Sequence, residues 1–278
     1  MKRFLILANS DKDEGLALSK KIQEYLKERG ATTEIASDVV NDYDGMSIKE
    51  ELLRGVEAVI VLGGDGTMLR AAHGIGDHDI PLIGINLGTL GFLTEVEQSN
   101  VYTVLDRLLV DDFELENRMM IEGRLKDRVF HSLNDIVIAR AGFSRVIGLS
   151  IYVNDQLLDT YEADGIILST PTGSTAYNMS AGGPIVSPRS RVIVVTPIAP
   201  HSLTSKSIVF DASDRIRIEI IKKRKTQNTE AIISFDGGNS LELGVGDVIN
   251  ASVSAREIRL IRMYNMNFYS VLRDKIGG

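Results

Sequence analysis

The chain has 278 residues, of which 44% are hydrophobic and 25% charged, a composition typical of one large or two modest globular domains. Its formal net charge of −7 argues against a nucleic-acid binder, because affinity for a phosphate backbone comes from clustered Lys and Arg. The absence of cysteine excludes disulfides, thiolate metal sites and a cysteine nucleophile. No apolar run approaches the length of a membrane span, so we expect a cytoplasmic protein with no membrane partner.

Residues 4–8 are apolar and predict a first parallel strand, followed by a helix that ends at Gly30. The apolar residues at helical spacing are Leu18, Ile22, Tyr25 and Leu26. A dehydrogenase-type dinucleotide fold would carry G-x-G-x-x-G in the first turn, whereas residues 9–14 contain no glycine. The common Rossmann interpretation is therefore disfavoured.

Residues 32–36 predict a short strand, residues 37–46 a polar loop and residues 48–54 a short helix. The next apolar run, residues 59–62, does not alternate with polar residues, which is typical of a strand covered on both faces of a parallel sheet. It leads directly into the sequence GGDGT at residues 63–67.

Three glycines in GGDGT, at positions 63, 64 and 66, permit positive φ and allow phosphates to approach the backbone closely. The following helix, predicted over residues 67–73, would offer free N–H groups. The carboxylate of Asp65 would repel a phosphate unless it holds a metal or takes a proton, so it indicates chemistry rather than mere binding. The alternative is an ordinary strand-to-helix turn with Asp65 as the N-cap.

A further strand is predicted over residues 80–85, followed by Asn86 and the glycine-rich residues 87–94. A glycine-rich segment at the carboxyl end of a parallel strand is where open α/β sheets bind ligands. Phe92 in this segment is either a core residue or a platform for an aromatic ring, and the core interpretation is favoured. An apolar helical face at Val101, Val104, Leu105 and Leu108 then completes an α/β domain, which we assign to residues 1–117.

Over residues 118–258 the pattern changes to short alternating strands separated by turn residues, which predicts an antiparallel β-sandwich domain. The predicted strands cover residues 119–125, 129–139, 146–153, 157–161, 165–169, 192–196, 207–210, 215–221, 231–235 and 248–254. The turns at 154–156, 211–214 and 236–238 suit hairpins, and the basic residues 222–225 suit a solvated loop. The C-terminal segment, residues 259–278, is predicted to return to the first domain.

Residues 161–184, YEADGIILSTPTGSTAYNMSAGGP, are the most unusual part of this β region. Asp164 precedes a strand, and a dense cluster of hydroxyls and glycines follows it. Such a loop can bind a ribose, a diphosphate or an amide, while Tyr177 adds a stacking face with a polar tip. The alternative is a Ser/Thr-rich surface loop. We favour a ligand-binding loop, because so many small hydroxyl residues are unusual in a β region that is otherwise apolar and charged.

ADGIILSTPTGSTAYNMSAGGP resembles the long signature of bacterial NAD kinases. That family also carries GGDGT, an Asn-acidic pair matched by Asn134 and Asp135, and a PIAPHSL-like stretch matched by residues 197–203. Lipid kinases and phosphofructokinases share GGDGT alone. The resemblance covers essentially the whole chain and implies an α/β N-terminal domain with a Rossmann-like parallel sheet. It further implies an all-β sandwich C-terminal domain, with the active site between the two.

The resemblance implies an NAD kinase, which phosphorylates the adenosine ribose 2′-hydroxyl of NAD with ATP to give NADP. Mg²⁺ would arrive with ATP, without a dedicated protein site, and bacterial relatives imply a homodimer or homotetramer. Such a transfer needs an in-line hydroxyl, charge neutralisation and a carboxylate for the hydroxyl proton, a role that Asp65 would take. By matched motif, the substrate- and phosphate-binding residues would be Gly63, Gly64, Gly66, Thr67, Arg70, Asn134, Asp135, Arg145, Glu162, Asp164, Thr172, Thr175, Ala176, Tyr177, Asn178, Ser180 and Ala199.

Two positions depart from the family pattern. Many relatives have a basic residue where this chain has Glu162, and many have DGQ where this chain has Gly238 in third place. Asn134 has a structural alternative, since an Asn at the end of a strand often only satisfies backbone groups, and His201 is expected to be structural. Two other functions stay open: a lipid kinase, for which the acidic composition offers no support, and a non-catalytic nucleotide sensor, against which Asp65 argues.

Overall fold

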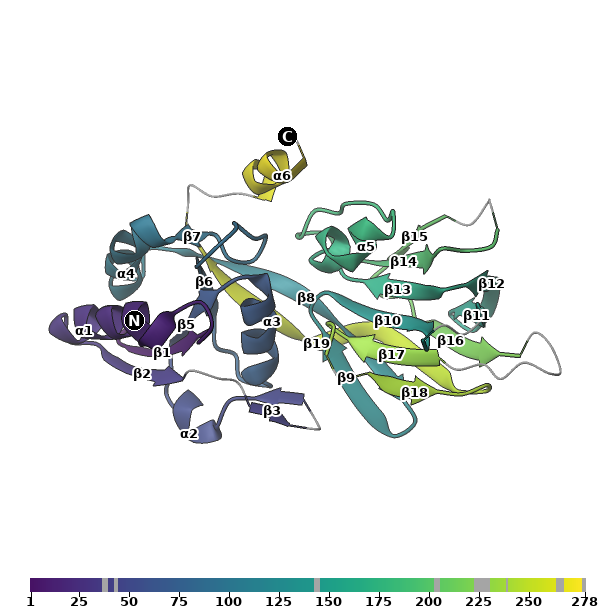
Figure 1. The fold of residues 1–278 in the computed structure, drawn as a ribbon, viewed down its shortest axis with the longest axis horizontal. Helices are drawn as coiled ribbons and strands as arrows, with labels where there is room; N and C mark the ends of the chain where they lie inside the picture. Colours follow the sequence, from purple (N-terminus) through teal and green to yellow (C-terminus); the bar gives the residue numbers. More distant parts are fainter. Residues whose placement is uncertain are drawn as a thin grey trace. The chain divides into compact units, whose positions relative to one another are not determined.

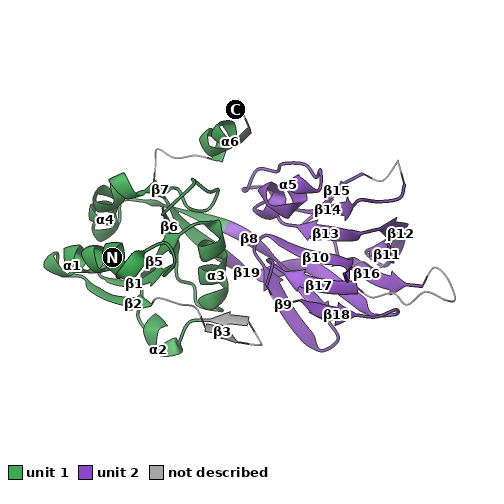
Figure 2. Ribbon diagram, in the orientation of Figure 1, with its two compact units in different colours: residues 1–117, 258–278 green, residues 118–257 purple. Residues whose placement is uncertain are grey.

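The computed structural model describes residues 1–36, 40–42, 45–142, 146–202, 206–222, 231–238, 240–263 and 268–276. It divides into two compact units, shown in Figure 2: residues 1–117 with 258–278 form unit 1, and residues 118–257 form unit 2. Two long strands, β8 (Glu114–Leu125) and β19 (Val248–Arg262), contribute residues to both units. Within the described residues, no helix is both long enough and apolar enough to span a bilayer.

Unit 1 is built on parallel strands in the order β6-β5-β1-β2 (Figure 1). Beside β8 and β19, its elements are β1 (Arg3–Ala8), η1 (Glu14–Leu16), α1 (Ala17–Glu28), β2 (Thr32–Ala36), β3 (Val40–Asp42), β4 (Gly45–Ser47), α2 (Glu50–Leu53), β5 (Ala58–Gly63), α3 (Asp65–Gly74), β6 (Leu82–Asn86), β7 (Val96–Glu97), η2 (Gln98–Asn100), α4 (Val101–Leu109) and α6 (Phe268–Ile276).

Helices cover both faces of this sheet, which explains why β5 and all of β1 after Arg3 are buried and carry no polar side chain. Helices α1 and α4 bury Ile22 and Leu105 against one face, in a cluster with Ile6 and Ile60. Helix α3 contacts β5 and β6 and inserts Met68 beside Gly84, where an added Cβ would lie 3.0 Å from the Met68 sulfur. The prediction of an α/β unit with a doubly covered parallel sheet is confirmed.

The predicted loop over residues 37–46 is wrong in part, because β3 and β4 pair there as an antiparallel hairpin. Only three residues pair on each side, with Asn41 opposite Met46. A hairpin this short leaves too few residues for the alternating pattern by which a strand is recognised in a sequence.

Unit 2 is antiparallel throughout. One sheet has the order β15-β14-β13-β10-β17-β18, and the opposing strands are β12, β11, β16 and parts of β19 and β8, with β9 beside β8. Inward residues such as Ile138, Leu168 and Ile218 form a single core. The elements are β9 (Arg128–Ser132), β10 (Asp135–Arg140), β11 (Ile147–Val153), β12 (Gln156–Ala163), β13 (Gly165–Ser169), η3 (Gly173–Thr175), α5 (Tyr177–Ser180), β14 (Val192–Ile198), β15 (Ile208–Asp211), β16 (Ile216–Ile221), β17 (Ala231–Phe235) and β18 (Leu241–Leu243). The all-β class predicted for this region is confirmed.

Two details of the predicted β region are wrong. The single strand expected over residues 129–139 is two strands, β9 and β10, interrupted at residues 133–134. The turn at 211–214 joins β15 to β16, which lie in different sheets, so it is not a hairpin. The turns at 154–156 and 236–238 do lie in hairpins, and Asn154, Asp155, Asp236 and Gly237 have the positive φ that tight hairpin turns require. Of the basic residues 222–225, those after Lys222 lie outside the described residues.

Candidate active site

The carboxylate of Asp65 is held by the glycine-rich segment that follows β6. The backbone N–H of Phe92 donates to Asp65 Oδ2 at 2.8 Å, and those of Leu93 and Thr94 donate to Oδ1 at 3.0 and 3.1 Å. The Thr94 hydroxyl adds a fourth bond at 3.2 Å. Asp65 does not act as the N-cap of α3, because it is the first helical residue and Gly64 occupies the cap position without a side-chain bond. The orientation of this carboxylate is therefore set by a second loop.

None of the three glycines of GGDGT uses the positive φ that glycine permits, and Gly63 is required instead for close packing. Gly64 has φ −119°, and Gly63 and Gly66 are not among the glycines with positive φ. A Cβ on Gly63 would lie 2.3 Å from the Thr67 hydroxyl, so only glycine lets the first turn of α3 close against β5. Gly91 has the same role beneath Asp65, because a Cβ there would lie 1.9 Å from Asp65 Oδ1.

Thr67 links the turn to its surroundings. Its hydroxyl accepts bonds from Arg70 Nη2 at 3.3 Å and from the side chain of Asn9 at 3.4 Å. On the next strand, Asn86 accepts from the Gly88 N–H at 3.0 Å and donates to the Gly88 carbonyl at 2.8 Å, which shapes the following loop. Residues from the carboxyl ends of β1, β5 and β6 therefore meet at one edge of the sheet, where parallel sheets bind ligands.

Unit 2 contains a second carboxylate that holds a backbone segment. Asp236 Oδ2 accepts from the Leu133 N–H at 2.6 Å, and Oδ1 accepts from the N–H groups of Asn134 and Asp135 at 2.7 and 3.0 Å. These bonds replace ladder bonds, which is why the strand predicted over residues 129–139 is interrupted. The half-buried Asn134 side chain makes no hydrogen bond to any described residue, so its amide is available to a ligand.

Asp135 is 5% exposed and lies beside Asp236. Burial, reinforced by the Asp236 charge, raises the pKa of Asp135 to about 7. A carboxyl with such a pKa can carry or release a proton near neutral pH, and groups of this kind gather at functional sites.

The loop after β13 packs on the backbone of Asn134. The Asn134 carbonyl accepts from the Thr170 N–H at 2.9 Å, and a Cβ on Gly173 would lie 2.1 Å from that carbonyl oxygen. Thr172 is buried and accepts from Arg118 at 3.2 Å. Asn178 is fully buried, donates to the carbonyls of Ser174 and Pro184, and accepts from Thr196.

The remaining residues predicted in this loop are accessible. Thr175 and Ala176 are half-buried, and Tyr177 and Ser180 are exposed, with Tyr177 45% exposed. The loop thus presents one side to solvent while buried amide and hydroxyl groups hold it in shape from within.

Asp164 pairs with Arg140, whose Nε donates to Asp164 Oδ1 at 2.8 Å. Glu162 is exposed on β12, and Ala199 after β14 takes an unusual φ of 43°, a strained geometry often found at functional loops. Arg145 lies outside the described residues.

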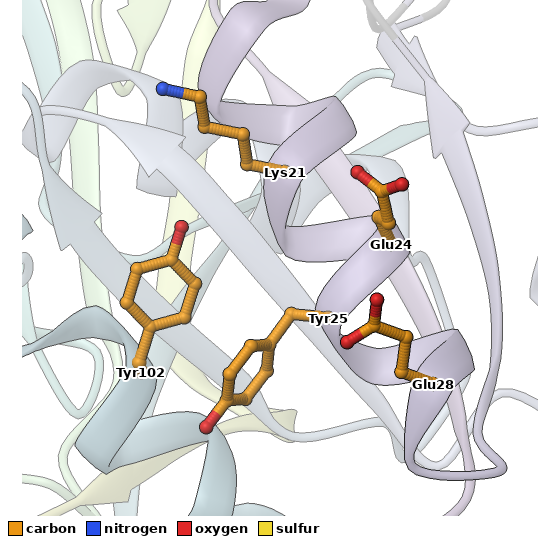
Figure 3. Close-up of a pocket in the computed structure, with 5 residues that line it drawn as sticks. All are labelled: Lys21, Glu24, Tyr25, Glu28 and Tyr102. Carbon is orange, nitrogen blue, oxygen red and sulfur yellow. The ribbon is translucent and has the colours of Figure 1, made fainter.

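Sequence reasoning missed the groups that orient the site: the amides of residues 92–94, the Asp236 carboxylate and Arg140. The register of β10 and β13 explains the position of Arg140: Ala139 pairs with Gly165, so Arg140 lies beside Asp164. This register is known only from the folded structure. An open pocket on α1 and α4, lined by Lys21, Glu24, Tyr25, Glu28 and Tyr102, contains none of the predicted site residues (Figure 3). We do not assign it to the reaction.

A carboxylate at a glycine-rich turn of an α/β unit, together with a hydroxyl-rich loop on an antiparallel unit, fits the class of phosphoryl-transfer enzymes that act on nucleotides. Family models described as the ATP-NAD kinase N-terminal domain and the ATP-NAD kinase C-terminal domain match residues 4–113 and 133–263. The chain belongs to the ATP-NAD kinase family. Its activity is that of an ATP-dependent NAD kinase.

Relatives of similar length support this assignment. The NAD kinase of Lachnoclostridium phytofermentans is 43% identical over 100% of this chain and 99% of its own, and that of Agathobacter rectalis is 43% identical with the same coverage. Among solved structures, yeast NADH kinase complexed with NADH has a TM-score of 0.86 at 26% identity, covering 100% of this chain and 88% of the yeast chain. An NAD kinase from Archaeoglobus fulgidus in complex with ATP has a TM-score of 0.79 at 26% identity, covering 99% and 98%.

Proposed function

We propose that this chain transfers the γ-phosphoryl group of ATP to the 2′-hydroxyl of the adenosine ribose of NAD, giving NADP. The observation that carries the proposal is the Asp65 carboxylate, oriented by three backbone amides and one hydroxyl at the edge of a parallel sheet. A carboxylate held this firmly presents its lone pairs in one direction without reorganising during the reaction, which is what a general base requires.

Asp65 accepts the proton of the 2′-hydroxyl as its oxygen attacks the γ-phosphorus and the bond to the β-phosphate oxygen breaks. Phosphoryl transfer needs little covalent chemistry from the protein beyond positioning and charge stabilisation. The remaining groups of this turn, Gly63, Gly64, Gly66, Thr67 and Arg70, bind phosphate oxygens. The Arg70 guanidinium already lies on Thr67, so it carries positive charge to this turn.

In unit 2, Asn134 and Asp135 hold ribose hydroxyls, with Asp236 keeping their backbone in place. Asp164 orients the dinucleotide, and its pairing with Arg140 fixes the direction of its carboxylate. Glu162 lies two residues before Asp164, and Ala199 follows Ile198, whose carbonyl accepts from the Asp164 N–H at 3.0 Å. Both complete the dinucleotide site, and Arg145 is a proposed phosphate contact.

The hydroxyl-rich loop supplies the pocket for a base or the nicotinamide. Its exposed and half-buried members, Thr175, Ala176, Tyr177 and Ser180, contact the ligand. Thr172 and Asn178 are buried and bonded within the loop, so their contribution is to hold it in shape.

Mg²⁺ accompanies ATP and neutralises the charge of its phosphates. Among the described residues no group of three or more His, Asp or Glu side chains is arranged to hold a metal. This donor set fits an ion held mainly by phosphates and water, the usual mode for Mg²⁺. NADH in the yeast relative and ATP in the archaeal one support the choice of substrates. We further propose a cytoplasmic homodimer or homotetramer.

NADP formation from NAD and Mg-ATP by the purified protein tests the proposal. Parallel reactions replace ATP with polyphosphate, NAD with NADH, or NAD with diacylglycerol, so that the donor, the acceptor and the lipid-kinase alternative are each measured. Tight NAD binding without NADP from either donor would overturn the kinase assignment and support a nucleotide sensor.

A further inference from the structure

The turn after β1 brings a lysine to the edge of the sheet that carries GGDGT. Asn9 anchors this turn: its N–H donates to the Leu62 carbonyl of β5 at 3.0 Å, and its carbonyl accepts from the Lys12 and Asp13 N–H groups at 3.0 and 2.9 Å. The Asn9 side chain also donates to Thr67 within GGDGT at 3.4 Å. The backbone of Lys12 is therefore fixed to the strand and turn that hold Asp65.

The Lys12 ammonium lies over two glycines from neighbouring strands. A Cβ built on Gly64 would be 3.5 Å from Lys12 Nζ, and a Cβ built on Gly88 would be 3.6 Å away. Gly64 precedes α3 and Gly88 follows β6, so the ammonium lies where the two strand ends meet. Because neither glycine has a side chain, the ammonium can lie close to the backbone of both strand ends while its other side faces solvent.

Within the described parts of the chain, no carboxylate neutralises this charge. Lys12 takes part in no ion pair with any described residue, and its side chain is exposed. The adjacent Asp13 is turned away and buried, because its carboxylate accepts from the Leu18 and Ser19 N–H groups at 2.8 and 3.0 Å and so holds the start of α1. An unpaired ammonium above two glycines has the charge and the access that a phosphate oxygen requires, and lysine is a usual phosphate ligand.

We propose that Lys12 is a phosphate-binding residue of this kinase, contacting the phosphate chain of a bound nucleotide at the GGDGT turn. The inference rests on the proposed function, since it concerns the same edge of the sheet. It adds a second cation to Arg70, contributed by a turn more than fifty residues earlier in the chain. The phosphate belongs to ATP or to NAD, and separate titrations distinguish the two.

The test compares Lys12→Met, Lys12→Arg and the control Lys20→Met. Lys20 is an exposed lysine of α1 whose ammonium donates to the Gly15 carbonyl. Lys20→Met therefore removes an equal charge, but at a position that is not at the sheet edge. KM for ATP is measured at saturating NAD, and KM for NAD at saturating ATP. We expect Lys12→Met to raise one KM by about tenfold or more, with Lys12→Arg recovering most of the loss and Lys20→Met close to wild type.

A rise in KM for ATP would show that Lys12 contacts the phosphates of ATP, and a rise in KM for NAD would show that it contacts the diphosphate of NAD. The melting temperature is expected to stay within about 1 °C of wild type, because the exposed Lys12 side chain makes no hydrogen bond or ion pair with any described residue. KM values for Lys12→Met within about twofold of wild type, or an equal effect in Lys20→Met, would overturn the inference while leaving the kinase assignment intact. Absence of NADP formation by the wild type would instead remove the proposed function itself.

Discussion

Arg262 and Asp65 are connected through a single residue, Phe92. The Phe92 N–H donates to Asp65 Oδ2 at 2.8 Å, and the Phe92 carbonyl accepts from Arg262 Nη2 at 3.5 Å. Arg262 also donates to Glu95 at 2.7 Å, and Glu95 accepts from the Met263 N–H at 3.0 Å. The end of β19 therefore holds both ends of residues 92–95, the segment whose amides orient Asp65.

Asp65→Asn is expected to lower turnover by about 10²-fold or more, because the amide cannot accept the hydroxyl proton. The fold and NAD binding should be largely kept, since an Asn oxygen still accepts the bonds made by Leu93 and Thr94. The assay is NADP formation, with NAD binding measured by calorimetry. Asp155→Asn, on an exposed hairpin turn, is the control and should keep wild-type turnover. Wild-type-like activity of Asp65→Asn would exclude the general-base role.

Gly91→Ala is expected to displace Asp65 without altering its chemistry. The added Cβ would lie 1.9 Å from Asp65 Oδ1, so either the carboxylate or the segment that holds it must move. We expect turnover to fall by about tenfold or more and stability by about 1–3 kcal/mol. Gly244→Ala is the control, because the nearest atom to its Cβ would be 3.9 Å away and its φ is not in the positive range. Equal behaviour of the two variants in turnover and urea unfolding would contradict the packing argument.

Arg262→Met should destabilise the protein and impair the reaction together. Arg262 is 13% exposed and pairs with Glu95 and Glu116, which are 8% and 17% exposed, so its loss removes the cation that faces two largely buried carboxylates. Breaking such a cluster costs about 3–5 kcal/mol. Burial already raises the pKa of Glu95 against the opposing charge of Arg262, so this loss would raise it further.

The matched control is Arg259→Met on the same strand. Arg259 pairs with Asp79, which is 76% exposed, so this change should cost no more than about 1 kcal/mol. Urea unfolding and kcat are compared for the two variants under conditions where both are folded. A smaller loss of kcat in Arg262→Met than in Arg259→Met would show that the β19 contact does not support Asp65.

Asp135 should make stability depend on pH. Its folded pKa of about 7 exceeds the ordinary value of 3.8, so between these values the folded state holds a proton that the unfolded state has lost. The contribution of Asp135 to the free energy of unfolding therefore falls as pH rises from about 4 to about 7, by roughly 4 kcal/mol in total.

The measurement is urea unfolding of wild type and Asp135→Asn at pH 4.5, 6 and 8. Asn carries no charge, so the variant should gain stability relative to wild type as pH rises, with the difference levelling off above pH 8. The Asp155→Asn control should show a constant difference. An advantage of Asp135→Asn that stays constant or shrinks with rising pH would contradict the shifted titration.

The local elements were predictable from the sequence because they depend on burial and chain geometry within a few residues. The unbroken apolar residues 59–62 predicted a strand covered on both faces, and GGDGT marked its carboxyl end. Alternation after residue 118 predicted the antiparallel unit. The kinase activity and the general-base role of Asp65 were predicted from the family resemblance.

Only the tertiary structure decided what holds these residues in place. Asp65 is oriented by amides 27 to 29 residues further along the chain, and Asp236 interrupts a predicted strand more than 100 residues before it. Arg262 reaches Phe92 across 170 residues. Periodicity reports which face of an element is buried, but a hydrogen bond between distant segments depends on strand register and packing. The sequence by itself therefore determined the two units and the identity of the reactive groups. The tertiary structure alone determined which distant segments orient each of these side chains.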